Sequence, residues 1–159
     1  MKADSLKGSI FSQIMQGNAS GVIVYEDDDC VVLMDAFPML AGHVLVIPRA
    51  EHIRIRDLPH SLRSHLFYIA TLLTQAMADL GLSCGDANIV INDGKHSGQS
   101  VPHVHLHIVP RQPRDGFPFP ALIANLVRKL SKKMAPIEEL ESIATPLRQS
   151  LQSLLVNQP

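Results

Sequence analysis

His103-Val104-His105-Leu106-His107-Ile108-Val109 alternates imidazole and aliphatic side chains along one short stretch of the chain. Side chains of a β-strand point alternately to its two faces, so the pattern predicts a strand over residues 103–109 with the three imidazoles on one face. A single histidine on an apolar face is usually a hydrogen-bonded core residue, whereas three in register fill a core poorly. The ordinary pKa of imidazole lies near neutrality, so the row can offer a nucleophile, a proton donor and an orienting partner. The stretch therefore predicts a chemical site.

Metal binding is the main alternative use of these imidazoles, because neutral imidazole is a common zinc ligand. Residues four apart on a strand are separated by about 13 Å, so at most two neighbouring histidines of the row could share one ion. The two cysteines, Cys30 and Cys84, stand singly and form no Cys-x-x-Cys pair. We therefore expect no metal and no other cofactor, and a metal-dependent hydrolase is the weaker alternative.

The polar stretch Asn92-Asp93-Gly94-Lys95-His96-Ser97-Gly98-Gln99-Ser100 separates the row from the apolar run 87–91. This order predicts a strand, a loop and a second strand, and backbone N–H groups of such a loop can hold an anion. The stretch completes neither a P-loop nor a G-x-G-x-x-G motif, so an ordinary hairpin connection is the alternative. Gln99 and Ser100 lead directly into the imidazoles, and their amide and hydroxyl can therefore reach the same substrate.

The stretch from Gly98 to Val109, Gly-Gln-Ser-Val-Pro-His-Val-His-Leu-His-Ile-Val, resembles the signature of the histidine-triad (HIT) nucleotide hydrolases and transferases. The resemblance covers roughly residues 8–116 and includes Gly42-His43-Val44-Leu45-Val46-Ile47-Pro48 and Asn92-Asp93-Gly94. It implies that His105 attacks the α-phosphorus of a nucleotide and forms a covalent nucleotidyl-imidazole intermediate, which water then hydrolyses. It also implies that His107 contacts the nonbridging phosphate oxygens and that His103 supports the orientation of the nucleophile's ring.

The same resemblance implies roles for residues outside the row. Ser100 and Gln99 would bond the phosphate and the leaving group, Asn92 the phosphate or ribose, and Asp35 the ribose hydroxyls. The apolar side chains that resemble the lining of the base pocket are Ile10, Phe11, Ile14 and Leu33. Taken singly, each of these four is more often a core residue than a ligand contact.

Two departures from the family pattern carry information. Ser9 and Ser12 stand where many bacterial members carry the Cys-x-x-Cys of a structural zinc site, which is a second reason to expect no zinc. The stretch 109–117, Val-Pro-Arg-Gln-Pro-Arg-Asp-Gly-Phe, is closer to the dinucleoside-polyphosphate branch than to the phosphoramidase branch. We expect metal-independent hydrolysis or transfer at the α-phosphate of adenosine-like nucleotides. A nucleoside phosphoramidase and a nucleotide-binding regulatory protein with little turnover are the alternatives.

Composition bounds the partners of the protein. With 159 residues, 46% of them hydrophobic, the chain can bury one substantial core. A formal net charge of -1 argues against binding of bulk nucleic acid, so the ligand should be a small nucleotide. No apolar run is long enough to span a membrane, and unpaired cysteines without a signal-like N-terminus indicate a cytoplasmic protein.

Periodicity predicts an α+β fold with five mostly antiparallel strands, two main helices and a C-terminal helical extension. The expected strands are 22–25, 30–34, 44–47, 87–91 and 103–109; the expected helices are one capped by Ser5 and ending at Gly17-Asn18, then 58–80, a helix with Leu122, Leu126 and Leu130, and 137–156. We expect a HIT-like catalytic domain over residues 1–116 and an extension over 117–159 that packs on this domain or on a dimer contact. The resemblance also implies a homodimer.

Overall fold

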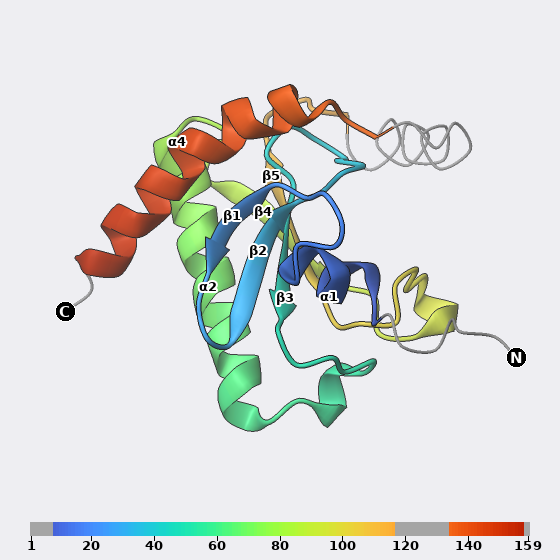
Figure 1. Cartoon of the computed structure of the whole chain (residues 1–159). Helices are drawn as coiled ribbons and strands as arrows, with labels where there is room; N and C mark the ends of the chain where they lie inside the picture. The colour runs from blue at the N-terminus through green and yellow to red at the C-terminus, as the bar shows by residue number, and fades with distance from the viewer. Residues whose placement is uncertain (1–7, 117–133, 158–159) are drawn as a thin grey trace, which may run out of the picture.

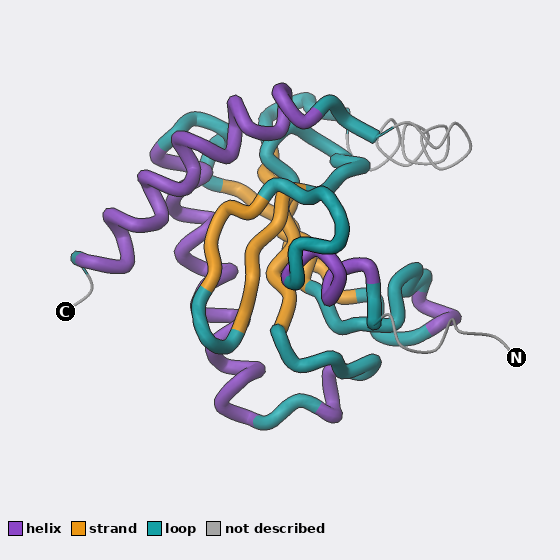
Figure 2. The backbone as a smooth tube through the Cα atoms, viewed as in Figure 1, coloured by secondary structure: helices purple, strands orange, loops and turns teal. Residues whose placement is uncertain are grey.

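A five-stranded antiparallel sheet forms the centre of the protein, as the sequence predicts (Figures 1 and 2). The computed structural model describes residues 8–116 and 134–157. The strands are β1 (Ile23–Glu26), β2 (Cys30–Met34), β3 (Val44–Pro48), β4 (Asp86–Ile91) and β5 (Leu106–Arg111). Their order in the sheet is β1-β2-β3-β5-β4, and every neighbouring pair is antiparallel. The α+β fold class is therefore confirmed.

Helices cover the two faces of the sheet unequally. The short helix α1 (Ile10–Met15) lies on one face, and the long helices α2 (His60–Asp79) and α4 (Ile137–Val156) lie together on the other (Figure 1). Two single turns of 3-10 helix, η1 (Ile55–Asp57) and η2 (Lys95–Ser97), interrupt the connecting segments. All residues of β2 and β3 are buried, because alternate side chains enter the cores on opposite faces.

The larger core lies between the sheet and the two long helices. Its sheet side includes Val104, Leu106 and Ile108, the aliphatic members of the alternating stretch. Its helix side includes Leu66, Ile69 and Leu73 of α2, and Leu140, Ala144, Leu147 and Leu151 of α4. Both long helices thus bury apolar side chains against one face of the sheet.

The smaller core lies under α1 on the opposite face. Phe11 packs there against Val31, Leu33, Leu45 and Ile47 of the two central strands. Leu45 is paired with His107 across the β3–β5 ladder. Because Leu45 and His107 are direct cross-strand partners, their side chains share this face. The imidazole side of the alternating stretch therefore faces α1.

Asp27, in the turn between β1 and β2, connects this edge of the sheet, where β1 lies, to helix α2. Its Oδ1 accepts the backbone N–H groups of Asp29 and Cys30 at 2.8 and 2.7 Å. Its Oδ2 accepts the hydroxyl of Tyr25 at 2.8 Å and lies 2.7 Å from Nε2 of His65 on α2. Burial alone would raise the pKa of Asp27, but these hydrogen bonds together lower it to about 2.

Two predicted boundaries are wrong for reasons that concern backbone hydrogen bonds. The last strand begins at Leu106 instead of residue 103, because the paired residues of β3 and β4 reach no further than Leu106. The N–H of Val104 bonds instead to the carbonyl of His52, at 2.7 Å. The first helix begins at Ile10 and is capped by Ser9, whose hydroxyl accepts the N–H of Ser12 at 3.1 Å. Ser5, the predicted cap, lies outside the described residues.

The helix predicted over residues 137–156 is confirmed at both ends, with Glu138 and Glu139 in its first turn. Acidic side chains at that position stabilise the helix through its macrodipole. The helix predicted around Leu122, Leu126 and Leu130 lies outside the described residues. In residues 8–116 and 134–157, no helix is both long enough and apolar enough to cross a membrane.

Candidate active site

A cavity of about 340 Å³ opens on the α1 face of the sheet. Its walls come from α1, from β2 and the turn after it, from the segment leading into β5, and from the chain that enters α4. The residues that line the cavity include Ile10, Phe11, Ile14, Leu33, Asp35, Phe37, Ser100, His105, His107, Met134, Ala135, Ile137 and Leu140. The cavity thus brings together two predicted catalytic imidazoles, Ser100, Asp35 and all four residues predicted for the base pocket.

The imidazole of His105 is held in one tautomer by the chain itself. Its Nδ1 lies 2.7 Å from the carbonyl oxygen of His103. A carbonyl oxygen only accepts, so Nδ1 carries the proton and Nε2 carries the lone pair. Burial lowers the pKa of His105 below its ordinary value, and the bond to the His103 carbonyl and the charge of Asp35 oppose this only in part. The ring is therefore neutral at pH 7, with its basic nitrogen on Nε2.

His107 is oriented by another histidine, His43, whose part in the site is not evident from the sequence. Nε2 of His43 lies 3.0 Å from Nδ1 of His107, and the backbone N–H of Met39 donates to Nδ1 of His43 at 3.1 Å. Since Nδ1 of His43 accepts, its Nε2 must donate to His107, which leaves the proton of His107 on Nε2. His107 is thereby prepared to donate a hydrogen bond from Nε2.

Asp35 lies close to both of these rings. Its Oδ2 is 3.4 Å from Nδ1 of His43 and 3.9 Å from Nδ1 of His107, while its Oδ1 accepts the N–H of Phe37 at 2.8 Å. The Met39 contact is shorter than the Asp35–His43 separation, which supports the assignment of Nδ1 as an acceptor. Burial lowers the pKa of His43, and Asp35 counteracts part of this effect. We therefore treat His43 as neutral.

His103 does not line the cavity and instead ties α1 to the start of β5. Its Nε2 lies 2.8 Å from the carbonyl of Pro48, and its Nδ1 lies 2.6 Å from the hydroxyl of Ser9. The carbonyl fixes the proton on Nε2, so Ser9 donates to Nδ1. The ring is fully buried, and burial lowers its pKa. His103 therefore acts on the site through its position and through its backbone carbonyl.

Phe11 completes the packing around the imidazoles. Its ring centroid lies 5.1 Å from that of His105 and 5.8 Å from that of His103, both in edge-to-face geometry. The rings of His105 and His107 are themselves 4.9 Å apart. Edge-to-face contacts at these distances are favourable, and they fix the planes of the rings. The helix α1 thus contributes orientation as well as apolar surface.

Gln99 and Asn92, two of the predicted site residues, lie outside the cavity lining. The amide of Gln99 accepts the N–H of Gly94 at 2.8 Å and donates to the carbonyl of Ile53 at 2.9 Å. Both ends of this side chain therefore hold the loop in place. The guanidinium of Arg54 also donates to the carbonyl of Asp93 at 2.7 Å. The loop is built by these contacts, and Ser100 is the residue that it presents to the cavity.

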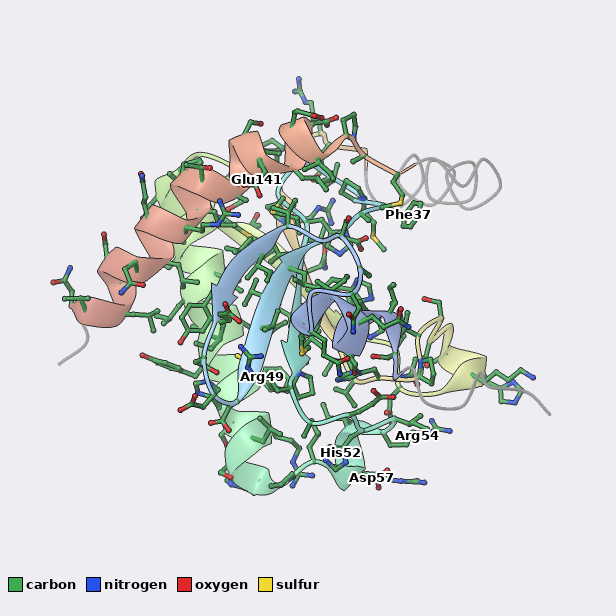
Figure 3. All side chains as sticks on the ribbon, viewed as in Figure 1. Phe37, Arg49, His52, Arg54, Asp57 and Glu141 are labelled. Atoms are coloured by element: carbon green, nitrogen blue, oxygen red, sulfur yellow. The ribbon has the colours of Figure 1, made fainter. Side chains whose placement is uncertain are left out.

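Gly94 permits this arrangement. Its φ is +110°, and a Cβ at this position would collide with the guanidinium of Arg54. The segment of Arg54 runs along one end of the molecule in Figure 3, next to His52. A side chain at position 94 would therefore strain the backbone and push the Arg54 guanidinium away from the carbonyl of Asp93.

Comparison with known proteins places this constellation in a family. The family model for the HIT domain matches residues 16–114, which include the three imidazoles and His43. The chain belongs to the HIT family. The match ends before residues 134–140, several of which line the cavity. This side of the cavity therefore comes from a part of the chain that the family model does not describe.

Individual relatives support the assignment. The HIT chain is 30% identical over 106 residues to the adenylylsulfatase HINT3 of Arabidopsis thaliana, an alignment that covers 67% of this chain and about half (53%) of that protein. It is 34% identical over 107 residues to an uncharacterised HIT-like protein of Methanocaldococcus jannaschii, covering 67% and 81% of the two chains. The crystal structure of a zinc-bound histidine triad family protein from Mycobacterium smegmatis matches with a TM-score of 0.77 and 30% identity, covering 94% of this chain and 96% of that one.

The donors around α1 do not fit a zinc ion. The hydroxyls of Ser9 and Ser12 are hydrogen-bonded, the first to His103 and the second to Glu51 at 2.5 Å. Protein zinc ligands are thiolates, imidazoles and carboxylates, and neutral serine hydroxyls do not replace the thiolates. The absence of a zinc site in this HIT protein stays a prediction that the donor chemistry supports.

A different group of possible ligand atoms lies beside the cavity, which two of its three residues line. Atoms of Asp35, His43 and His107 all lie within 4.8 Å of one another, close enough to surround one cation. However, both nitrogens of His43 are already hydrogen-bonded, to Met39 and to His107. A cation would have to break the contact that sets the tautomer of His107. The hydrogen-bonded arrangement therefore favours proton positioning over metal binding at this point.

Proposed function

We propose that this HIT protein catalyses metal-independent hydrolysis or transfer at the α-phosphate of adenosine-like nucleotides, through a nucleotide bound covalently to His105. The observation that carries the proposal is the 2.7 Å contact between Nδ1 of His105 and the carbonyl of His103. It keeps the lone pair on Nε2 of a buried, neutral ring in the cavity. A neutral imidazole is nucleophilic and becomes a good leaving group once it is bonded to phosphorus.

The reaction divides into two displacements. In the first, the lone pair of Nε2 bonds to the α-phosphorus, and the bond to the leaving group breaks with its electron pair. The ring then carries positive charge, which the carbonyl of His103 stabilises through the proton on Nδ1. In the second, a water oxygen bonds to phosphorus, the N–P bond returns its pair to Nε2, and a proton passes to solvent. The products are a nucleoside monophosphate and the released group.

His107 and Ser100 provide the polar support for this chemistry. Because His43 leaves the proton of His107 on Nε2, that nitrogen can donate to a nonbridging phosphate oxygen in both steps. The hydroxyl of Ser100 lines the same cavity and can bond the phosphate or the leaving group. Asp35 supplies a carboxylate for the ribose hydroxyls. The apolar side chains of α1 and β2 supply the surface for the base.

Three classes of leaving group are compatible with this mechanism. Sequence favours dinucleoside polyphosphates because of the stretch 109–117, but Arg111 bonds Asp115 at 2.6 Å and Asn88 at 2.6 Å and lies outside the cavity lining. Arg111, the last residue of β5, is thus held by contacts within the protein, and the described part of this stretch, residues 109–116, gives that branch no direct support. A phosphoramidate is the alternative, and the name of the Arabidopsis relative adds adenylyl sulfate as a candidate.

We also propose that two copies form the working unit. The strand β4 is an edge of the sheet, and its Ile89 and Val90 are 41% and 40% exposed. An exposed apolar edge strand favours pairing with another strand. Analytical ultracentrifugation tests this part of the proposal: a concentration-independent monomer would contradict it.

Turnover of several substrates in parallel tests the activity. Adenosine phosphoramidate, adenylyl sulfate and dinucleoside tri- and tetraphosphates are offered to the wild-type protein, to His105→Asn and to His96→Asn, an exposed histidine outside the cavity lining. We expect AMP from at least one substrate, its loss in His105→Asn with nucleotide binding retained, and normal turnover in His96→Asn. Full activity after exhaustive chelation would separate this mechanism from a metal-dependent one. Absence of turnover from every substrate, with nucleotides still bound, would favour a regulatory binding protein.

A further inference from the structure

The first residues of α4 and the segment just before the helix form one side of the cavity. They lie outside residues 16–114, the part of the chain that the family model matches. We call Met134, Ala135, Ile137 and Leu140 the outer wall. The N–H of Ala135 bonds to the carbonyl of Ala36 at 2.9 Å, which ties this segment to the turn after β2. Figure 3 shows Phe37 of that turn beside the chain that enters α4.

The outer wall is held in place by the core. Leu140 is buried in the larger core together with Leu147 and Leu151 of the same helix. On the next turns, the guanidinium of Arg148 donates to the carbonyl of Ile23 in β1 at 2.8 Å. The position of α4 on the sheet is therefore fixed, and with it the position of the wall residues relative to the imidazoles.

Two members of the outer wall expose apolar surface that a ligand could cover. Met134 and Ile137 are 53% and 52% exposed although both line the cavity. The facing surface, from Phe11 and Ile14 of α1 and Leu33 of β2, is apolar as well. The imidazoles and the carboxylate of the lining lie close together: the rings of His105 and His107 are 4.9 Å apart, and Oδ2 of Asp35 lies 3.9 Å from Nδ1 of His107. A ligand with a phosphate at one end and a flat apolar group at the other matches this distribution.

We infer that the outer wall is the second surface of a base-binding slot, so that residues 134–140 contribute affinity for the base of the nucleotide and none for its phosphate. This inference rests on the proposed function, because it takes the phosphate to lie at His105. It assigns the C-terminal extension a direct part in substrate selection. The sequence predicts an extension that packs on the domain or on a dimer contact, and the inference adds contact with the substrate to that packing role.

Binding of AMP and of ribose 5-phosphate tests the inference, since the two ligands share a phosphate and a ribose and differ in the base. The test variant is Met134→Ala/Ile137→Ala, and the control is Val156→Ala, an apolar residue 72% exposed near the other end of α4. Calorimetry on the full-length protein should give an AMP Kd about tenfold weaker in the double variant, from lost apolar contact area. The Kd of ribose 5-phosphate should change less than twofold, and Val156→Ala should bind both ligands as wild type does.

Each other outcome overturns the inference in a recognisable way. Equal weakening of both ligands would contradict the inference, because the outer wall would then affect binding of a ligand that has no base. Wild-type affinity for AMP in the double variant, with AMP still bound more tightly than ribose 5-phosphate, would remove the outer wall from base binding and leave the proposed function intact. No binding of AMP to the wild-type protein would refute the proposed function together with the inference.

Discussion

Replacing His43 by asparagine should disable His107 without altering the nucleophile. An asparagine oxygen can still accept the N–H of Met39, but the donor that reaches Nδ1 of His107 is removed. His107 is 12% exposed in its side chain, so its Nδ1 would lose a partner in a largely buried place. A buried acceptor without a partner costs about 1–3 kcal/mol. The ring can avoid this cost by moving its proton to Nδ1, and Nε2 then no longer donates to the phosphate.

The expected kinetic consequence is a kcat about 10- to 100-fold lower, which corresponds to about 1.4–2.7 kcal/mol in the barrier. KM should change little, because the apolar surface for the base is untouched. Long-range ¹H–¹⁵N NMR reports the tautomer directly. In the wild-type protein, we expect Nδ1 of His107 unprotonated and Nε2 protonated, and in His43→Asn a mixture of the two tautomers.

A matched control is His65→Gln. His65 also bonds a partly buried neighbour, Asp27, at 2.7 Å, but it lies on α2 and outside the cavity lining. We expect a loss of stability and an unchanged kcat. The reasoning would be refuted by a His43→Asn protein with kcat within twofold of wild type and an unchanged His107 tautomer.

Three further predictions concern stability and pH. Asp27→Asn should lower the free energy of unfolding by about 2 kcal/mol at pH 7, because the pKa of this carboxyl falls from 3.8 to about 2 on folding. In urea titrations, the difference in unfolding free energy between variant and wild type should have its full size above pH 4. The difference should vanish as the pH falls toward 2. Burial lowers the pKa values of His43, His103 and His105 from 6.5. As the pH falls below about 6.5, the unfolded chain therefore binds protons before the folded protein does, and stability should decline. A urea midpoint that stays constant from pH 8 to pH 5 would contradict this prediction. Ser9→Ala should lower stability by about 1–3 kcal/mol, measured by urea denaturation, since it leaves Nδ1 of His103 without its donor; unchanged stability would mean that another group replaces the hydroxyl.

Local periodicity was enough to predict the frame of the fold. Val104, Leu106 and Ile108 enter the larger core as their alternation predicts, and the apolar stripe over residues 137–156 is buried against the sheet. Such patterns depend on the period of a strand or helix, which a sequence displays directly. The boundary at Leu106 could not be read in this way, because it depends on where neighbouring strands stop.

The site was predictable to the extent that its residues are adjacent in sequence or carry a known signature. The role of His43 was not, because it depends on a contact with a ring 64 residues away and on an N–H in the turn before it. The only local sign was a histidine after Gly42, directly before a buried strand. In the sequence, Ser9 stands out only as a departure from a cysteine pattern, because its contact with His103 depends on the packing of α1. Met134 likewise lines the cavity only because α4 is fixed on the sheet.

Mass spectrometry of the enzyme during turnover tests the central claim most directly, since a double displacement must pass through a covalent adduct. The reaction is stopped in alkali, because N–P bonds to imidazole hydrolyse readily in acid, and the digested protein is searched for a nucleotidyl group. We predict that the group is found on the peptide containing His105 and is absent from His105→Asn. A turning-over enzyme with no adduct at any time, or with the nucleotide on another residue, would contradict the assignment of Nε2 of His105 as the nucleophile.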